Sequence, residues 1–459
     1  MENQAVILEK MITSLLNEKK YPSLRDILVT MNPSDIASVF GELEPDRIPL
    51  LFRLLPKEQA AETFVEMDPE AQELLIQGFS DSELKEVVDE LYLDDAVDLV
   101  EEMPANVVRR ILTQADPETR KSINELLRYP ENSAGSMMTT EYVTLRPSMT
   151  VEESILRIRR TGVDKETIYT CYVTDNRTLL GLVTVKDLLL AEDDETPIRA
   201  IMQTHVISVS TLADQEEVAR MFAKYNFLAL PVVDNENRMV GIVTFDDAMD
   251  VMEEEATEDI EIMGGMSPSE KTYSRATTWD LFKQRIPWLL LLMVSATFTG
   301  MIITGFENAL AAQVALTAFI PMLMDTGGNS GSQACVSIIR GISLNEIEFR
   351  DLGRVVWKEI RVSVLCGVCL AVACFAKIVV VDMLLLKSES VTYLVAFVVC
   401  ATMAVTVCLA KIVGSTLPLL AKKLGFDPAV MASPIITTIV DFLSLLVYFA
   451  FATAILGIG

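Results

Sequence analysis

Two hydrophobic patterns divide this chain of 459 residues. Between residues 31 and 126, pairs of apolar residues recur every 12 positions among polar and charged ones. From residue 285 onward, long uncharged apolar stretches dominate instead. The first pattern is typical of short amphipathic helices and the second of membrane-spanning helices. The chain is therefore predicted to combine a water-soluble part with a membrane part.

The 12-residue pattern predicts one short helix and one turn per unit. The units begin at Met31, Leu43, Leu55, Met67, Phe79, Leu91, Met103 and Ala115. Proline follows at the third position in several units, and capping residues such as Asn32, Ser80 and Asp116 stand at the second, where they favour a helix start. Because units of this kind stack on their neighbours, residues 1–130 are predicted to form an all-α helical solenoid.

Strand-like and helical runs alternate in the next region, residues 131–253. The strand-like runs are 168–173, 180–183, 228–233 and 240–243, and the helical runs are 151–160, 215–225 and 246–252. Two similar halves emerge, one ending in GLVTVKD and the other in GIVTFDD. They resemble the halves of a CBS-domain pair, an α/β regulatory module that often binds adenine nucleotides. That resemblance implies a candidate nucleotide site at Tyr169, Thr184 and Asp187, with possible ATP binding, although the fold alone does not establish one.

The apolar part, residues 285–459, predicts a transmembrane domain of five helices. The stretches are 286–306, 308–339, 362–382, 391–410 and 429–459. Each is long enough to cross a hydrocarbon core of ~30 Å. Basic residues gather in the connections between the second and third stretches and between the fourth and fifth, which places those connections in the cytosol. The N-terminus is then inside and the C-terminus outside.

The distribution of charged residues supports this division into a soluble part and a membrane part. The formal net charge is −27, whereas residues 285–459 contain 10 acidic and 11 basic side chains, so the soluble part carries nearly all of the excess. Such a surface excludes nucleic-acid binding through phosphate contacts and favours cations. The single histidine, His205, makes a His-based zinc site or catalytic triad improbable on chemical grounds, and no nucleophile–base set indicates an enzyme. Residues 1–284 contain one cysteine and begin without a signal-peptide core, which fits the cytosol.

The most acidic segment, residues 246–261, holds nine carboxylates and no basic residue. One interpretation is a solvated acidic linker. The other is a sensor for divalent cations, because hard cations take several oxygen ligands and would cancel the repulsion. No EF-hand spacing is present, so ligands would have to converge from different segments.

Two carboxylates interrupt the apolar stretches, and such residues usually face a bundle interior or a pore. Asp441 shares a helical face with Ser433, Thr437 and Ser444. Asp325 begins the run DTGGNSGSQ, in which Asp325, Gly328, Asn329, Ser332 and Gln333 share one face if the stretch is helical. The alternatives are a helix broken at the glycines, glycines that serve close packing, and an ion pair between Asp441 and Lys377.

The order of these regions resembles the MgtE family of bacterial magnesium channels. The match includes ATEDI (256–260), the glycine-rich run around Asn329, and LGFDP (424–428) ahead of Asp441. The resemblance implies a helical solenoid at 1–130, tandem CBS domains at 131–253, an acidic connecting helix at 254–284 and the membrane domain at 285–459. It further implies a homodimer in the cell membrane that conducts Mg²⁺ and closes when cytosolic Mg²⁺ is high.

The resemblance also implies roles for single residues. Asp441 would bind hydrated Mg²⁺ in the pore, with Thr437, Ser433, Asn329 and Gly328 around the ion. The remaining Mg²⁺ ligands would be Asp427 at the cytosolic pore mouth, Asp247, Asp250, Glu258 and Asp259 on or near the connecting helix, Glu216 in the second CBS half, and Glu62, Asp94 and Asp98 in the solenoid. Asp325 has no place in this scheme. Two other functions stay open: a secondary transporter coupled to protons through Asp441, and a membrane-anchored nucleotide sensor.

Overall fold

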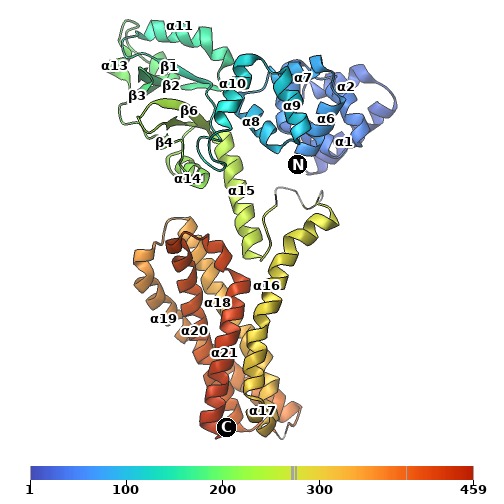
Figure 1. Cartoon of the computed structure of the whole chain (residues 1–459), viewed down its shortest axis with the longest axis vertical. Helices are drawn as coiled ribbons and strands as arrows, with labels where there is room; N and C mark the ends of the chain where they lie inside the picture. Colours follow the sequence, from blue (N-terminus) through green and yellow to red (C-terminus); the bar gives the residue numbers. More distant parts are fainter. Residues whose placement is uncertain (1, 270–272, 274–275, 389, 458–459) are drawn as a thin grey trace. The chain divides into compact units, whose positions relative to one another are not determined.

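The computed structural model describes residues 2–269, 273, 276–388 and 390–457, without the side chains of residues 2–7, 9, 164 and 433. The chain forms two compact units, Met1–Glu253 and Glu254–Gly459 (Figure 1). The boundary falls within one continuous helix, α15 (Phe245–Met263), which contains the acidic run. The helical run expected at 246–252 is therefore only the first part of a longer helix.

The first unit begins with a series of short helices. These are α1 (Glu2–Asn17), α2 (Tyr21–Leu28), α3 (Pro33–Gly41), the 3₁₀ turn η1 (Pro45–Arg47) leading into α4 (Ile48–Phe52), α5 (Lys57–Val65), α6 (Pro69–Gly78), α7 (Asp81–Val88), α8 (Leu93–Glu102), α9 (Ala105–Gln114) and α10 (Pro117–Leu126). From α3 to α10 each helical element, with η1 and α4 counted together, begins 12 residues after the one before. The Asn32, Ser80 and Asp116 side chains accept hydrogen bonds from free N–H groups at helix starts.

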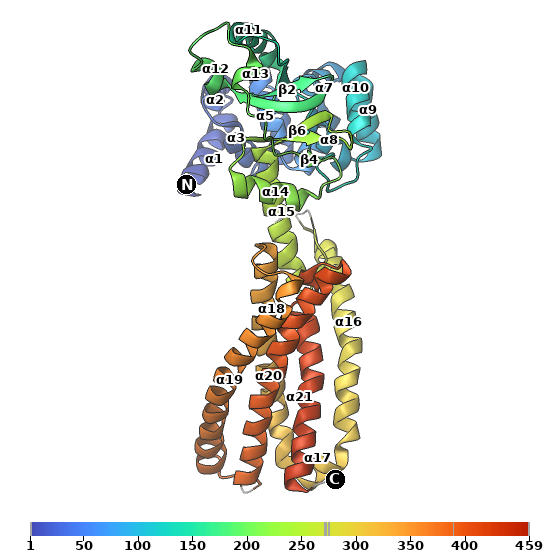
Figure 2. The same ribbon diagram turned by 90° about the vertical axis from the view of Figure 1, so that its left-hand side faces the viewer.

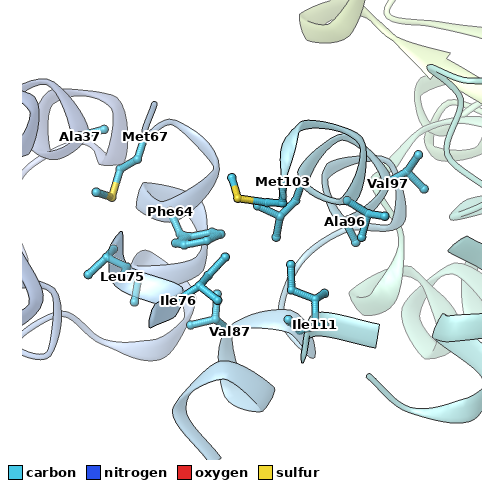
Figure 3. Close-up of a cluster of buried hydrophobic side chains, with 14 of the residues drawn as sticks. Ala37, Phe64, Met67, Leu75, Ile76, Val87, Ala96, Val97, Met103 and Ile111 are labelled. Carbon is cyan, nitrogen blue, oxygen red and sulfur yellow. The ribbon is translucent and has the colours of Figure 1, made fainter. Parts of the chain in front are cut away.

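The apolar pairs of successive helices face one another and form a continuous core (Figure 3). Phe64 of α5, Leu75 and Ile76 of α6 and Ile111 of α9 are almost fully buried within it. Because each short helix buries its apolar face only against its neighbours, no single unit of this series has a core of its own.

The rest of the first unit contains two three-stranded sheets of the same topology. The first has β1 (Tyr142–Leu145), β2 (Thr167–Asp175) and β3 (Thr178–Thr184), and the second has β4 (Val209–Ser210), β5 (Ala229–Val233) and β6 (Met239–Thr244). In each sheet the first strand is parallel to the second, and the third is antiparallel to the second. The helices are α11 (Val151–Thr161), α12 (Val185–Leu189), α13 (Ile198–Ile201), α14 (Gln215–Tyr225) and the start of α15. The two similar halves expected from the sequence are thus present.

Long helices dominate the second unit (Figures 1 and 2). They are α16 (Thr278–Gly305), α18 (Ile320–Ser343), α19 (Leu352–Lys377), α20 (Tyr393–Leu424) and α21 (Ser433–Leu456). Shorter elements connect them: α17 (Glu307–Ala312), η3 (Val314–Phe319), η4 (Phe349–Asp351), the π-helical η5 (Ile378–Leu385) and η6 (Pro428–Met431). In the part of the chain that the structure describes, four spans are long and apolar enough to cross a membrane: Thr278–Gly305, Phe349–Leu385, Tyr393–Leu424 and Pro428–Leu456. Helix α18, expected as a further span, is 24 residues long but is not among them.

Helix α18 is one uninterrupted α-helix, so the alternative of a helix broken at the glycines is wrong. Its glycines instead allow close approach to α20 and α21. A Cβ at Gly327 would lie 2.7 Å from Thr406 Cγ2 and 2.9 Å from Ser444 Oγ, and a Cβ at Gly331 would lie 2.8 Å from Ile436 Cγ2. Small residues at these positions let the three helices pack closely.

Candidate functional site

A group of carboxylates gathers in the first unit around α8 and the beginning of α15. We call it the α8–α15 carboxylate cluster; its members are Asp94, Asp95, Asp98, Glu141, Glu166, Asp246 and Asp247. Asp94 is only 5% exposed, and its Oδ1 accepts a hydrogen bond from the Asp95 N–H at 3.1 Å. Glu141 accepts another from the Leu93 N–H at 3.2 Å, which ties the segment before β1 to the start of α8.

The cluster opposes its own ionisation. Burial, together with the charges of Asp247 and Asp246, raises the pKa of Asp95 to about 7. Burial and neighbouring carboxylates likewise raise the pKa of Glu166 to about 8. The charges that raise these pKa values all belong to carboxylates. Binding of a cation would offset this repulsion directly.

Some of the Mg²⁺ ligands expected in the solenoid and on the acidic helix belong to this cluster. Asp94, Asp98 and Asp247 are members, and Asp250 lies at its edge, where burial and the charge of Glu66 raise its pKa. Glu62 is exposed on α5, and its charge acts on Tyr92 next to α8.

Two features limit how the cluster could hold an ion. Asp247 Oδ2 accepts hydrogen bonds from the N–H and hydroxyl of Thr244, which leaves the Oδ1 side for a further ligand. Among the described residues, no three His, Cys, Asp or Glu side chains are close enough together to ligate one metal ion directly. An ion that keeps its water shell, as Mg²⁺ usually does, needs a wider arrangement of carboxylates than a bare ion.

Glu216 has a different environment. It lies in the first turn of α14, and its Oε1 is 3.1 Å from Arg220 Nη1 one turn later. A cation would have to compete with this guanidinium for the carboxylate.

A second carboxylate group lies in the second unit, near the start of α21. Desolvation and the charges of Glu255 and Asp427 raise the pKa of Glu258. Asp427 caps η6, since its Oδ1 accepts a hydrogen bond from the Ala429 N–H at 2.8 Å. Asp259 is half-buried on the same helix as Glu258. The expected ligands Glu258 and Asp427 are therefore electrostatic neighbours, although 169 residues separate them in sequence.

The end of α15 is anchored to the helices that follow. Met263 packs against the apolar cluster that includes Ile436 and Val440 of α21. Gly265 has φ +71°, and a Cβ there would lie 2.8 Å from Pro434 Cγ. Glu261 accepts hydrogen bonds at 2.9 Å from the Ser269 N–H and from the Gln284 amide. The acidic helix is thus fixed directly at the first turn of α21.

The expected pore residues lie on α18 and α21. Asp441 and Thr437 are half-buried, and Asn329 is exposed. No hydrogen bond or ion pair reaches the Asp441 carboxylate from the described residues. The alternative partner, Lys377, forms an ion pair with Asp382 at 2.9 Å, and the described contacts contain no Lys377–Asp441 pair.

Gly328 and Ser433 differ from the other expected pore residues, as does Ser444, which the sequence places on the helical face of Asp441. Gly328 is buried, and a Cβ there would lie 3.0 Å from Thr437 Cγ2, so it packs α18 against α21 and does not share the exposed face of Asn329. Ser444 is also buried, and its hydroxyl donates to the Val440 carbonyl. The Ser433 side chain lies outside the described part of the chain.

The candidate nucleotide residues lie close together on the first sheet. Thr184 and Asp187 form a capping box at the start of α12, in which the Thr184 hydroxyl donates to Asp187 Oδ2 at 2.6 Å. Tyr169 is 67% exposed on β2, next to Thr170, which pairs with Thr184 across the sheet. Since neighbouring residues of a strand point to opposite faces of a sheet, Tyr169 points away from the face that Thr170 and Thr184 share.

Comparisons with known proteins agree with this arrangement. Residues 31–132 match the model of the MgtE intracellular N domain, residues 134–194 and 198–254 match CBS domains, and residues 320–451 match the MgtE divalent cation transporter domain. The magnesium transporter MgtE of Thermus thermophilus is 38% identical over 98% of this chain and 99% of its own length. That of Bacillus subtilis is 32% identical over 96% of both chains.

This chain belongs to the MgtE family. Members of this family are membrane transporters, which confirms the expectation that the chain is not an enzyme. The alternative of a nucleotide sensor that is merely anchored in the membrane is set aside for the same reason.

Two solved structures resemble the soluble part of this chain. The cytosolic domain of the Mg²⁺ channel MgtE in complex with ATP is 40% identical, with a TM-score of 0.51 over 53% of this chain and 99% of that one. The soluble part of a magnesium transporter is 29% identical, with the same TM-score over 55% and 99%.

Several members of the α8–α15 carboxylate cluster were not predicted from the sequence. Asp95 adjoins Asp94, and Asp246 belongs to the acidic run, so both carried a signal that was available. Glu141 and Glu166 carried none, because single acidic residues in a strongly acidic chain are not distinctive. Only the fold brings these two near α8 and α15.

Proposed function

We propose that this chain is a Mg²⁺ channel for magnesium uptake that closes when cytosolic Mg²⁺ is high. It works as a homodimer in the cell membrane, with residues 1–130, 131–253 and 254–284 in the cytosol, and with residues 285–459 forming five membrane-crossing helices. The C-terminus lies outside. Helix α18 serves as the additional span because, at ~1.5 Å per residue, its 24 residues reach across a bilayer core.

The α8–α15 carboxylate cluster is the observation that carries this proposal. Its raised pKa values mean that the metal-free arrangement is electrostatically unfavourable at neutral pH. Mg²⁺ among these carboxylates favours the compact arrangement, and loss of Mg²⁺ favours one in which α8 and α15 separate. The Mg²⁺ ligands are Asp94, Asp98, Asp247 and Asp250, with Glu62 nearby and Glu216 in the second CBS half.

The signal reaches the membrane through α15. Its second half carries Glu258 and Asp259, and Glu258 interacts with Asp427 at the start of η6. Mg²⁺ between Glu258 and Asp427 holds the helix against α21. Without Mg²⁺ the two carboxylates repel each other, and the helix moves away from the pore mouth.

The ion pathway runs along α21 and α18. Asp441 binds hydrated Mg²⁺ through the waters of the ion, and Thr437, Asn329 and Ser433 set the width around it. Gly328 contributes by letting α18 approach Thr437. ATP binding at Tyr169, Thr184 and Asp187 adjusts the Mg²⁺ sensitivity; the ATP complex of the related cytosolic domain supports this part of the proposal.

Inside-out patch recording of the full chain tests the proposal. Cytosolic Mg²⁺ is raised from zero to about ten millimolar, the range expected for weak sites with shared carboxylates. Openings should disappear as Mg²⁺ rises, and the variant Asp247→Asn should require more Mg²⁺ for the same closure. Asp35→Asn, an exposed change outside the cluster, is the matched control.

Flux into liposomes separates this function from the runner-up, a secondary transporter coupled to protons through Asp441. A channel passes Mg²⁺ down its own gradient without a proton gradient. The absence of unitary currents, together with flux that follows an imposed proton gradient, would replace the channel by the transporter.

A further inference from the structure

Helix α18 presents two chemically different faces. Gly327, Gly331 and Ala334 are buried against the neighbouring helices. On the opposite side the exposed positions include Asp325, Asn329, Gln333 and Ser337, which recur every four residues. This polar stripe follows α18 for more than three turns. Within a bilayer such a stripe requires water or protein beside it, because lipid cannot solvate carboxylate and amide groups.

The contacts of the buried face fix how α18 lies against α21. Gly331 approaches Ile436, and Gly328 approaches Thr437. Gly327 approaches Val440 and Ser444. Residue numbers rise along α21 as they fall along α18, so the two helices are antiparallel.

Asp325 and Asp441 therefore lie at the same level. Asp325 precedes Gly328 by three residues on α18, and Asp441 follows Thr437 by four residues on α21. Because the helices are antiparallel, both steps run toward the same end of the helix pair. The two carboxylates are close enough for their charges to interact.

The Asp325 side chain is held in place by its own helix. The Asn329 amide Nδ2 donates to Asp325 Oδ1 at 3.0 Å, one turn along the exposed face. Among the described residues, no lysine or arginine forms an ion pair with Asp325. A carboxylate that is oriented but not neutralised thus stands opposite Asp441.

We propose that Asp325 is a second ion-binding carboxylate of the permeation pathway and that it sets, with Asp441, the preference for divalent over monovalent cations. The inference rests on the proposed pore function of Asp441. Each carboxylate attracts a divalent ion twice as strongly as a monovalent one, because the Coulomb energy scales with ion charge, so a second carboxylate at the same level enlarges the energy difference between the two ions. Asn329 is a positioning residue that keeps Asp325 turned toward the pathway.

The test compares Asp325→Asn with Asp441→Asn in recordings of the full chain. Currents are carried by Na⁺, and Mg²⁺ is added on the external side while cytosolic Mg²⁺ is kept low. Glu307→Gln is the matched control, because it removes an exposed carboxylate from the same unit away from the stripe. Asp325→Asn should weaken the block by Mg²⁺ roughly tenfold and lower the Mg²⁺ permeability relative to Na⁺, while closure by cytosolic Mg²⁺ is retained.

The variants separate this inference from the proposed function. If Asp325→Asn matches Glu307→Gln while Asp441→Asn loses the block, the inference fails and the proposed pore site stands. If Asp325→Asn alone loses the block, Asp325 binds the ion and the proposed function of Asp441 fails. If neither variant changes the block, both fail.

If Asp325→Asn gives no currents, the variant Asp325→Glu decides whether the carboxylate or the fold of the helix was lost. Currents that are blocked by Mg²⁺ in Asp325→Glu support a requirement for the carboxylate. If Asp325→Glu is silent as well, the position serves the structure of the helix and the inference is overturned.

Discussion

Removal of one negative charge from the α8–α15 carboxylate cluster should stabilise the soluble unit when no metal is present. We choose Asp95→Asn, because Asp95 has an acidic neighbour on its own helix and interacts with both Asp246 and Asp247. Asparagine keeps the size of the side chain and its ability to accept a hydrogen bond. The substitution therefore changes the charge and little else.

The expected magnitude follows from the pKa. A shift of the Asp95 pKa from 3.8 to about 7 corresponds to ~4 kcal/mol at neutral pH if Asp95 alone carries the whole cost. Asp95 is half-buried and shares its repulsion with several carboxylates, so screening and relaxation reduce the gain to ~2 kcal/mol. For a unit of this size that corresponds to a rise in Tm of about 4–8 °C.

The assay is thermal unfolding of the soluble part, residues 1–264, in a chelator at about pH 8, above the raised pKa of Asp95. Relatives of this part have been crystallised without the membrane domain. Asp35→Asn is the control for loss of an exposed acidic charge. A Tm for Asp95→Asn that equals the control, or lies below the wild type, would refute the argument that the metal-free cluster is under electrostatic strain.

The pH dependence has a definite sign. A carboxyl group whose pKa is higher in the folded state binds its proton more tightly there, so metal-free stability falls as pH rises from about 4 through about 7. The advantage of Asp95→Asn should therefore shrink toward zero at about pH 4.5, where Asp95 is protonated in the folded wild type. Saturating Mg²⁺ should reverse the ranking at about pH 8, because the wild type then has one more charge with which to bind it.

Two further predictions concern the membrane unit. Gly414→Ala should lower the free energy of unfolding in detergent by ~3 kcal/mol, because a Cβ there would lie 2.3 Å from the Gly331 carbonyl oxygen. The control Gly353→Ala meets no neighbouring atom and should be neutral. Equal melting temperatures of the two variants would contradict the packing argument. Lys411→Met should lower the free energy of unfolding by ~3 kcal/mol, because it leaves the carboxylate of Glu359, 4.0 Å away, without its partner. Adding Glu359→Met should recover most of this loss in a double-mutant cycle. Additive losses would show that the two residues do not act as a pair.

Local regularities explain which parts of the fold were predictable. The 12-residue period predicted where each short helix begins, because proline and capping residues mark helix starts through local backbone chemistry. Strand-like runs predicted β2, β3, β5 and β6 but neither β1 nor β4, and α14 begins and ends at the residues predicted for it. The acidic helix ends at Met263, where Gly264 and Gly265 follow as a helix-stop signal in the sequence and Gly265 takes φ +71°. The packing of Met263 against α21 could not be predicted in this way, because it depends on a helix that lies far along the chain.

The candidate sites were less predictable, because their members meet only in three dimensions. Glu166 is a single acidic residue at the start of a strand, and nothing in its neighbourhood distinguishes it from the other acidic residues of the chain. Helical periodicity placed Gly328 on one face with Asp325 and Asn329, yet Gly328 is buried where α18 approaches Thr437. Periodicity predicts which residues share a face, but it does not predict which neighbour covers that face.

Helix α18 shows how the two interpretations of its sequence belong together. The glycines were open to two readings, close packing or an ion pathway, and the structure assigns packing to one face and the polar stripe to the other. The packing face leaves helix α18 little freedom to rotate. A rotation would bring larger side chains into the positions of Gly327 and Gly331, where they would collide with α20 and α21. A helix that cannot rotate keeps Asp325 and Asn329 pointing in one direction. The tight glycine contacts are therefore a physical condition for an ion pathway on the opposite face, and a substitution that loosens them should disturb ion selectivity without touching a carboxylate.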